Sequence, residues 1–337
     1  MIVACLRILI VKLSSLGDVV HALPVVADIR ARHPAARIDW VVEPGFAPLV
    51  RRTAGIADVI ECPLRRWRRA GFWKPSVLGE MRAFAARLRR EHYDAVIDLQ
   101  GLTKSALIAC LARGPSFGLA NRTEGASHEA PARWLATRAV RVEPHSHALD
   151  RSRELVARAL GTRIDAPPSF GVSPRALADS TDACAVVFIH GSSRADKLWP
   201  EASWIELGRR LVGSGLRIAL PQANADEGER AARIAAAIGA ADCDLWPALP
   251  LAAFIDRLAA TAGAIGVDSG PSHIATALGL PHVQLYNFPT SWRTGPQARH
   301  GARQQVAVEG EPTPTVAAVW AAWQGVASSA ALIAAPR

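Results

Sequence analysis

The stretch that decides the fold reads RILIVKLSSLGDVVHALPVVADIRAR and spans residues 7–32 of a chain of 337 residues. Arg7–Lys12 is an apolar, largely β-branched run, which is typical of a buried strand. From Asp18 to Arg32 apolar residues recur at helical spacing, so we expect an amphipathic helix there. A buried strand that leads directly into such a helix begins a βαβ unit, and it predicts a parallel sheet.

The same alternation continues through the first half of the chain. Apolar runs predict strands at Ile38–Val42, Asp58–Glu61 and Ala95–Leu99, and a periodic segment predicts a helix at Ala148–Leu160. Residues 165–182 (DAPPSFGVSPRALADSTD) interrupt the pattern with three prolines, which is typical of a linker between domains.

After this linker the alternation starts again. The expected strands are Ala185–His190, Leu216–Leu220, Ala264–Val267 and His282–Tyr286, and the expected helices are Trp204–Val212, Asp226–Ile238, Leu251–Ala260 and one from Ser272. The predicted fold class is therefore α/β, with two Rossmann-like domains, 1–170 and 171–337, facing a central cleft. In such folds ligands bind at the carboxyl ends of the strands. Whether the C-terminal helix packs back on the first domain stays open.

Composition bounds the class of protein. Hydrophobic residues make up 50% and charged residues 20%, as in ordinary globular proteins, and no apolar run approaches the ~18 residues of a membrane span. The N-terminus lacks the basic region and cleavage site of a signal peptide, so we expect a cytoplasmic protein. The five cysteines are scattered, which argues against disulfides and a zinc site. A formal charge of +9 predicts an anionic partner: nucleic acid, membrane or phosphorylated substrate.

The loop KLSSLGD, residues 12–18, joins the first strand to its helix, where backbone N–H groups and the helix dipole can meet a ligand. It matches neither the P-loop nor the G-x-G-x-x-G fingerprint. Asp18 is the candidate catalytic base in this loop. Position alone favours a simpler alternative, in which Asp18 caps the helix.

A second loop, HGSSRADKLWP at residues 190–200, follows the first strand of the second half. The hydroxyl groups of Ser192 and Ser193 and the backbone amides can contact phosphate oxygens, and the ammonium group of Lys197 can offset their charge. The alternative is an ordinary solvated loop.

The third loop is GVDSGPSH, residues 266–273. A buried strand leads to Asp268, and Ser269 and Gly270 then expose backbone amides at the N-terminus of a helix, which suits a diphosphate without a metal ion. The alternative is a helix cap at Ser269 or Ser272.

The run RRWRRAGFWK, residues 65–74, combines five cations with three aromatic side chains. It suits an anionic, phosphate-bearing lipid headgroup and a nucleic acid equally well. Residues 242–244 (DCD) resemble a D-x-D metal motif, but we expect them to open a short surface strand. No H-E-x-x-H motif or Cys/His cluster is present in the sequence, so no metal site is predicted.

Together these segments resemble the inverting GT-B heptosyltransferases of glycosyltransferase family 9. The resemblance runs from Arg7 to about Val326, and the order and spacing of its motifs make it specific. The motifs are RILIVKLSSLGDVVHALP, DWVVEPGFA, RRWRRAGFW, HYDAVIDLQGLTKSA, DKLWP and VDSGPSH. The resemblance implies transfer of L-glycero-D-manno-heptose from ADP-heptose to the inner Kdo of Kdo2-lipid A. It also implies an enzyme without a metal or other cofactor, peripheral at the cytoplasmic face of the inner membrane.

The resemblance assigns roles to individual residues. Asp18 matches the catalytic base, and Lys197 matches the lysine at the diphosphate. Ser192 and Ser193 take the place of threonines that contact the phosphates, and Glu227 matches the acidic residue near the ribose. The remaining donor-binding residues are Asp268, at the heptose hydroxyls, and Ser269, Gly270, Ser272 and His273 in the diphosphate turn. The acceptor-binding residues are Arg65, Arg66, Arg68 and Arg69.

Two features depart from the family pattern. Met1–Cys5 precede the family's usual start and predict an upstream initiation. The turn YNFPT, residues 286–290, lacks the Gly-Pro-Thr continuation expected after its Tyr, so its contacts with the donor are not predicted.

Three other functions stay open at this point. One is a heptosyltransferase that acts on an already heptosylated core, and another is a sugar-nucleotide epimerase of the same fold. The third is a basic nucleic-acid-binding protein. Aspartates in the turns at both sheet ends would repel phosphodiester, so no nucleic-acid partner is expected.

Overall fold

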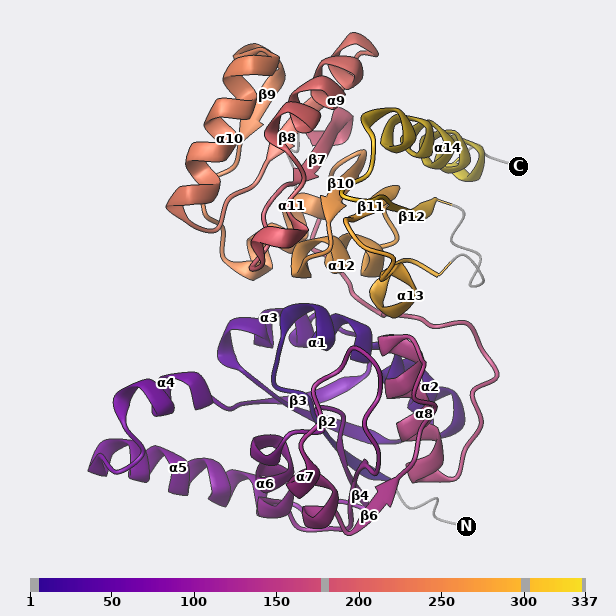
Figure 1. Cartoon of the computed structure of the whole chain (residues 1–337). Helices are drawn as coiled ribbons and strands as arrows, with labels where there is room; N and C mark the ends of the chain where they lie inside the picture. Colours follow the sequence, from indigo (N-terminus) through magenta and orange to yellow (C-terminus); the bar gives the residue numbers. More distant parts are fainter. Residues whose placement is uncertain (1–5, 177–181, 298–303, 335–337) are drawn as a thin grey trace. The chain divides into compact units, whose positions relative to one another are not determined.

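The computed structural model describes residues 6–176, 182–297 and 304–334, with side chains as far as residue 328. Met1–Cys5, where the sequence predicts an upstream initiation, lies outside these residues. The chain divides into two compact units, Met1–Val172 and Ser173–Arg337, and each is built on one six-stranded sheet (Figure 1).

Strands and helices alternate along the first unit. Its strands are β1 Arg7–Val11, β2 Arg37–Val42, β3 Ile56–Glu61, β4 Ala95–Asp98, β5 Ser116–Leu119 and β6 Arg138–Val140. Its helices are α1 Leu16–Ala22, α2 Pro24–Arg32, α3 Ala47–Arg51, α4 Leu64–Ala70, α5 Pro75–Leu88, α6 Thr103–Leu111, α7 Ala130–Leu135 and α8 Ala148–Leu160. All pairings are parallel, in the order β3-β2-β1-β4-β5-β6.

The second unit repeats this plan. Its strands are β7 Ala185–Ile189, β8 Arg217–Leu220, β9 Cys243–Leu245, β10 Gly263–Val267, β11 His282–Tyr286 and β12 Gln305–Glu309. Its helices are α9 Glu201–Gly213, α10 Ala225–Ile238, α11 Leu251–Ala259, α12 Gly270–Ala277, α13 Ser291–Thr294 and α14 Val316–Ala334. The order β12-β11-β10-β7-β8-β9 is again fully parallel.

The strand order reverses once in each sheet, between β1 and β4 and between β7 and β10. At such a switch point the two chain segments that follow the strands run to opposite sides, which leaves room for a ligand at the carboxyl ends. The loops after β1, β4, β7 and β10 are therefore the places to look for a site.

The predicted fold class, α/β with Rossmann-like halves, is confirmed. Every predicted strand is present, with ends within two residues of those expected. The single helix expected over Asp18–Arg32 is wrong, because the chain forms α1 and α2 there. Pro24 has no N–H group to continue the hydrogen bonds of α1, and it occupies the first position of α2 instead.

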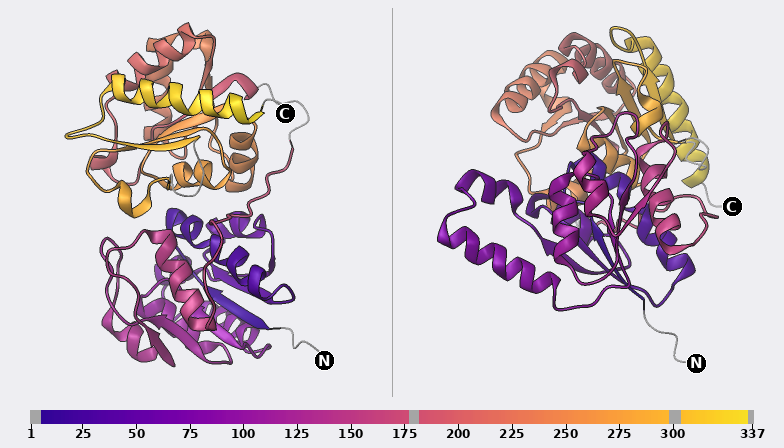
Figure 2. Two further views of the ribbon diagram at one scale, coloured as in Figure 1. Left: turned by 90° about the vertical axis from the view of Figure 1, so that its right-hand side faces the viewer. Right: turned by 60° about the horizontal axis from the view of Figure 1, so that its bottom comes forward.

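The C-terminal helix α14 belongs to the core of the second unit. Its residues Val319, Trp323 and Val326 are buried in the same cluster as strand residues of that sheet. Figure 2 shows this helix, in yellow, lying across the sheet. Within the second unit, α14 therefore packs on the sheet of that unit.

The first unit holds α2 and α8 together with a buried ion pair. The guanidinium group of Arg153 donates to both carboxylate oxygens of Asp28 at 2.6 Å, and the Arg153 side chain is only 3% exposed. A buried charge that loses its partner is strongly destabilising, whereas an exposed pair contributes little.

We therefore expect Arg153→Met to lower the free energy of unfolding by about 3–5 kcal/mol. Arg158→Met is the matched control on the same helix, because Arg158 is 55% exposed and pairs with Glu154 at the surface. It should cost less than about 1 kcal/mol. Urea unfolding followed by circular dichroism measures both, and equal losses would contradict the prediction.

Candidate functional site

Two loops at the switch point of the second sheet bring predicted donor-binding residues together. Lys197 lies in the loop after β7, and Asp268 directly follows β10. The Nζ atom of Lys197 is 2.5 Å from Oδ2 of Asp268, although the residues are 71 positions apart. The two side chains are 28% and 13% exposed, so this is a largely shielded ion pair.

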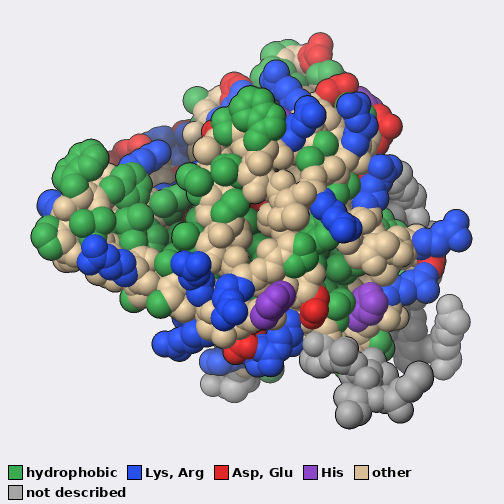
Figure 3. All heavy atoms as spheres, turned by 90° about the horizontal axis from the view of Figure 1, so that it is seen from below, with side chains coloured by type: hydrophobic (Ala, Val, Ile, Leu, Met, Phe, Trp, Pro, Cys, Tyr) green, Lys and Arg blue, Asp and Glu red, His purple; other side chains and the backbone are tan. Residues whose placement is uncertain are grey.

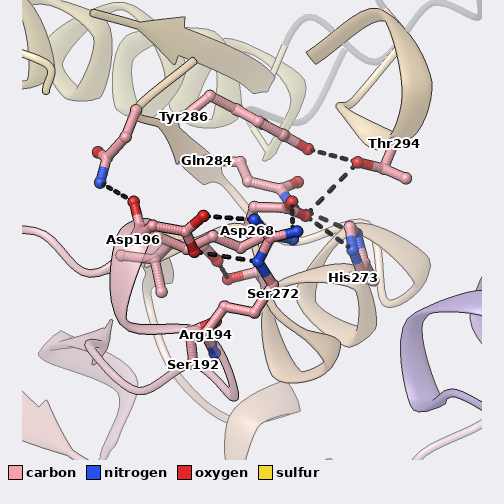
Figure 4. Close-up of polar contacts among 12 residues, drawn as sticks. Ser192, Arg194, Asp196, Asp268, Ser272, His273, Gln284, Tyr286 and Thr294 are labelled. Atoms are coloured by element: carbon pink, nitrogen blue, oxygen red, sulfur yellow. Dashed lines mark hydrogen bonds and ion pairs between the residues drawn. The ribbon is translucent and has the colours of Figure 1, made fainter. Parts of the chain in front are cut away.

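Asp268 is the centre of a wider polar network (Figure 4). Its Oδ1 atom lies 3.3 Å from Nε2 of His273 and accepts a hydrogen bond from Oγ1 of Thr294 at 3.4 Å. Burial by itself raises the pKa of Asp268, but His273 and Lys197 outweigh it and hold that pKa well below its usual range. Asp268 is therefore a carboxylate at neutral pH and can accept hydrogen bonds from hydroxyl groups.

The turn after β11 supports this network. The hydroxyl group of Tyr286 lies 3.2 Å from Oγ1 of Thr294, and Nδ2 of Asn287 donates to the carbonyl groups of Asp196 and Leu198 at 2.9 Å each. Asn287 thereby fixes the loop that carries the lysine. The sequence left the roles of this turn unassigned, and Thr294 carried no motif that could have singled it out.

Glu227 lies in the first turn of α10 and takes part in its N-terminal cap. Its N–H group donates to Oδ1 of Asn224 at 2.9 Å, and its Oε2 atom accepts from the backbone of the preceding loop at 2.7 Å. A Cβ atom on Gly191 would come within 2.5 Å of Oε1 of Glu227. The glycine therefore lets this carboxylate reach the loop that carries Ser192, which is half-buried, and Ser193, which is exposed.

The N-terminus of α12 follows Asp268. Gly270 is its first residue, and Ser269 is its N-cap residue, with a buried Oγ atom that has no hydrogen-bond partner among the described residues. Ser272 plays an internal role instead, because its hydroxyl group donates to the carbonyl of Val267 at 2.6 Å and is fully buried. Gly266 makes room for it, since a Cβ atom there would lie 2.3 Å from Oγ of Ser272. The hydroxyl group of Ser272 is thus used inside the turn.

In the first unit, Asp18 is the third residue of α1, and Ser15 is the N-cap residue. Oδ2 of Asp18 accepts hydrogen bonds from the N–H group of Ser15 at 3.0 Å and from its hydroxyl group at 2.6 Å, so the two form a capping box. Burial raises the pKa of Asp18, but Lys12, 4.0 Å away, and the Ser15 hydrogen bonds outweigh it and lower that pKa. The carboxylate is ionised at neutral pH, and its side chain is 41% exposed.

The loop that carries Asp18 is clamped by a residue that follows β4. Oε1 of Gln100 accepts hydrogen bonds from the N–H groups of Leu13 and Ser14 at 3.0 and 3.3 Å, and its Nε2 atom donates to the carbonyl of Ser14 at 2.6 Å. The sequence did not single out Gln100. Its place directly after a predicted strand was the available signal.

A buried cation and a buried carboxyl group lie next to this clamp. Nζ of Lys12 donates to the carbonyl of Leu99 at 3.0 Å. Asp98 accepts hydrogen bonds from the hydroxyl group of Ser105 at 3.0 Å and from the N–H group of Gln100 at 2.9 Å. Burial nevertheless raises the pKa of Asp98 to about 6, because these contacts offset only part of the cost of desolvation.

The four predicted acceptor-binding arginines lie on α4 and are all exposed. The guanidinium carbon of Arg65 lies 5.6 Å from the ring centre of Phe46, and Arg66 pairs with Glu80. Arg68 and Arg69 form no ion pair in the described part of the chain. Trp67, which lies between Arg66 and Arg68, is 4% exposed and belongs to the core. The aromatic residues of this run therefore do not act as one surface.

No group of three or more His, Cys, Asp or Glu side chains within the described ranges is arranged to hold a metal ion. Asp244 of the D-x-D segment instead accepts hydrogen bonds from Nε1 of Trp246 at 3.1 Å and from Arg257.

The profile of "Glycosyltransferase family 9 (heptosyltransferase)" matches residues 81–317. The chain belongs to glycosyltransferase family 9. It is a heptosyltransferase of that family, as its motifs predicted, and that prediction is confirmed.

Individual members of glycosyltransferase family 9 are also similar to this chain. Lipopolysaccharide heptosyltransferase 1 of Escherichia coli K12 is 39% identical over 285 residues, which cover 83% of this chain and 88% of that protein. The enzyme of the same name from Pseudomonas aeruginosa is 38% identical over 297 residues, covering 87% and 82%. The solved structure of E. coli heptosyltransferase WaaC with ADP-2-deoxy-2-fluoro heptose superimposes with a TM-score of 0.80 and 33% identity, over 93% of this chain and 98% of that one.

The raised pKa of Asp98 predicts a pH-dependent stability of this heptosyltransferase. Between pH about 4, the usual value for Asp, and about 6, the folded state holds a proton that the unfolded state has lost. Stability should therefore fall as pH rises through this window, by up to about 3 kcal/mol.

Asp98→Asn should remove this contribution, because the amide does not titrate. Asp94→Asn, at an exposed position on the same segment, is the control that should keep it. Urea unfolding midpoints measured between pH about 4 and about 6 test the prediction. If Asp98→Asn left the dependence of the midpoint on pH unchanged, the prediction would be refuted.

Proposed function

We propose that this chain is an inverting glycosyltransferase that moves L-glycero-D-manno-heptose from ADP-heptose to the inner Kdo of Kdo2-lipid A. This is a step in the synthesis of the lipopolysaccharide core. The observation that carries the proposal is the Lys197–Asp268–His273 cluster at the second switch point. The chain that presents it is 39% identical to a lipopolysaccharide heptosyltransferase 1.

The donor site follows from the charges of this cluster. In the free protein Lys197 is neutralised by Asp268 at 2.5 Å. A diphosphate offers the ammonium group a stronger partner, and the backbone amides of Ser269 and Gly270 add hydrogen bonds at a helix N-terminus. The carboxylate that is released can then accept hydrogen bonds from sugar hydroxyl groups. Glu227, beside the loop of Ser192 and Ser193, suits a ribose hydroxyl group in the same way.

The chemical step needs a base on the acceptor and a stabilised leaving group. Asp18 takes the proton of the acceptor hydroxyl group while that oxygen forms a bond to the anomeric carbon of heptose. The bond from this carbon to the diphosphate oxygen breaks, and its electron pair leaves with ADP. A single displacement of this kind inverts the anomeric configuration. Because the acceptor oxygen becomes strongly acidic as the new bond forms, a carboxylate with a lowered pKa suffices as the base.

We expect Asp18→Asn to lower the rate of transfer by about 10²–10⁴-fold and to leave the affinity for ADP-heptose unchanged. Ser15→Ala is the matched control, because it removes a hydrogen bond of the capping box but keeps the carboxylate. It should cost about 1 kcal/mol of stability and little turnover. The rate of transfer at saturating ADP-heptose and the affinity for ADP-heptose, measured by calorimetry, test this prediction. Near-normal turnover of Asp18→Asn would refute the base assignment.

The chain's own charged and polar groups stabilise the leaving group. Lys197 and the amides at the start of α12 meet the negative charge that develops on ADP, and each such donor typically contributes about 10²–10³-fold. We therefore propose that the reaction needs no metal ion.

Incubation with ADP-heptose and Kdo2-lipid A should give a product heavier by one heptose, detected by mass spectrometry, with or without EDTA. Loss of product in EDTA that Mg²⁺ restores would overturn the metal-free mechanism. Product formed only from an already heptosylated acceptor would instead assign the chain to the second heptose. Conversion of the donor without any acceptor would identify an epimerase.

The acceptor and its location complete the proposal. Arg65, Arg66, Arg68 and Arg69 present four exposed guanidinium groups to the anionic Kdo and phosphate groups. Because Kdo2-lipid A is anchored in a bilayer, the enzyme works as a peripheral protein at the cytoplasmic face of the inner membrane. Nucleic acid has no place in this reaction.

A further inference from the structure

Exposed hydrophobic side chains are concentrated on α5, α6 and α7 of the first unit and on the turn before α5. Within the described residues eight large hydrophobic side chains are exposed, and five of them lie between residues 73 and 134. They are Trp73 (83% exposed), Leu78 (37%), Leu107 (52%), Leu111 (38%) and Trp134 (75%), which we call the α5–α7 face. Such clustering marks an interaction surface more often than scattered apolar residues do.

The helices that carry this face are neighbours. Phe84 and Leu88 of α5 share one core cluster with Ile108 of α6, so both helices pack on the same core. The Sγ atom of Cys110 on α6 lies 3.2 Å from the carbonyl oxygen of Leu135 on α7. In Figure 3 the lobe at the left is formed by α4 and α5. Hydrophobic surface runs inward from this lobe, with Lys and Arg side chains along its borders.

Exposed hydrophobic and cationic side chains share helix faces. Lys104, Leu107 and Leu111 recur at spacings of three and four, so they share one face of α6. On α5, Leu78 and Arg82 are one turn apart and both exposed. An aliphatic row with cations beside it is the pattern of a helix that lies at a bilayer surface.

The charge of these helices has a single dominant sign. The segments α4, α5, α6 and α7 contain eight Lys and Arg residues and one carboxylate, Glu80, which pairs with Arg66. The exposed cations nearest in sequence to the α5–α7 face form no ion pair in the part of the chain that the structure describes. They are Lys74, Arg82, Lys104 and Arg133.

We propose that the α5–α7 face docks directly on an anionic lipid bilayer, with both tryptophans and the leucines in the headgroup boundary and the cations on lipid phosphates. Tryptophan is enriched at this depth, and each juxtamembrane cation adds about 1 kcal/mol of attraction. A second copy of the chain fits less well, because a self-complementary interface would bring like charges together. Leucines do not stack on bases, which disfavours nucleic acid. Among the described residues no helix is both long and apolar enough to cross a bilayer.

This inference goes beyond the proposed reaction, since it concerns lipid and requires no acceptor sugar. The test is flotation of the full chain with vesicles of phosphatidylcholine, with and without phosphatidylglycerol, and free of lipid A. We expect binding only to the anionic vesicles, weakened by salt. We test two double variants of the face, Trp73→Ala/Trp134→Ala and Leu107→Ser/Leu111→Ser. Each should reduce that binding by about tenfold or more.

The matched control is Ile164→Ser/Leu245→Ser, which removes two other exposed aliphatic side chains, 38% and 45% exposed, outside the face. It should bind vesicles like the wild type, and thermal unfolding should show that all variants are folded. Absence of wild-type binding to acceptor-free anionic vesicles would overturn the proposal. Equal loss in the control, or a dimer that the tryptophan variants dissociate without lipid, would overturn it too.

A second assay separates this idea from the proposed reaction. With a Kdo acceptor from which the acyl chains have been removed, the face variants should keep wild-type kcat and KM, because the lipid is absent. A parallel loss of activity on this acceptor would mean that the substitutions damage the site and would overturn the docking role. If the wild type transferred no heptose to any acceptor but still bound vesicles, the proposed reaction would be refuted and the proposed docking on lipid would be supported.

Discussion

Both halves of the molecule depend on one topological constraint, the single reversal of strand order in each parallel sheet. Chain segments on either side of a reversal leave in opposite directions, so the carboxyl ends of the two central strands are not covered by a crossing helix. In the first unit this opening receives the loop of Asp18 after β1 and the Gln100 clamp after β4. In the second it receives Lys197 after β7 and Asp268 after β10.

The charges at these openings are set by their immediate partners. Asp268 and Asp98 both lose solvent, but Asp268 faces a histidine and a lysine, while Asp98 has mainly neutral hydrogen-bond donors close to it. The pKa of the first carboxyl group is therefore lowered, and that of the second is raised to about 6. Burial alone does not decide the charge of a carboxyl group. In the proposed donor site, Lys197 keeps Asp268 ionised in the free protein and exchanges it for the diphosphate when the donor binds.

Local sequence was enough to predict most of the fold and the loops that carry the site. The strand runs are continuous and apolar because both faces of a parallel sheet are buried, which makes them visible in the sequence. The short strands β5, β6 and β12 were missed, because three to five residues give little periodicity. The break between α1 and α2 was missed although Pro24 marks it.

Long-range partners were harder to predict than loops. Nothing in the sequence places Thr294 beside Asp268, or Asn287 against the loop of Lys197, because tertiary contacts bring these residues together across 26 and about 90 positions. Ser272 shows the same limit of residue type. Its type and position suit a phosphate contact, but its hydroxyl group is used inside the turn. Residue type shows what a side chain can do, and packing determines which partner it has.

The basic, aromatic run at 65–74 shows why the distribution of a charge matters more than its size. Trp67 and Trp73 are six positions apart in one motif, yet the first is in the core and the second is 83% exposed. Four short helices carry eight of the chain's cations and a single carboxylate, and the chain as a whole has a formal charge of +9. The helices that expose tryptophan or leucine, α5, α6 and α7, carry four of these eight cations, and α4, which precedes them in the chain, carries the other four. An even distribution would only keep the protein soluble, whereas this one places cations and exposed apolar side chains, both of which a lipid surface requires, on successive segments of the first unit.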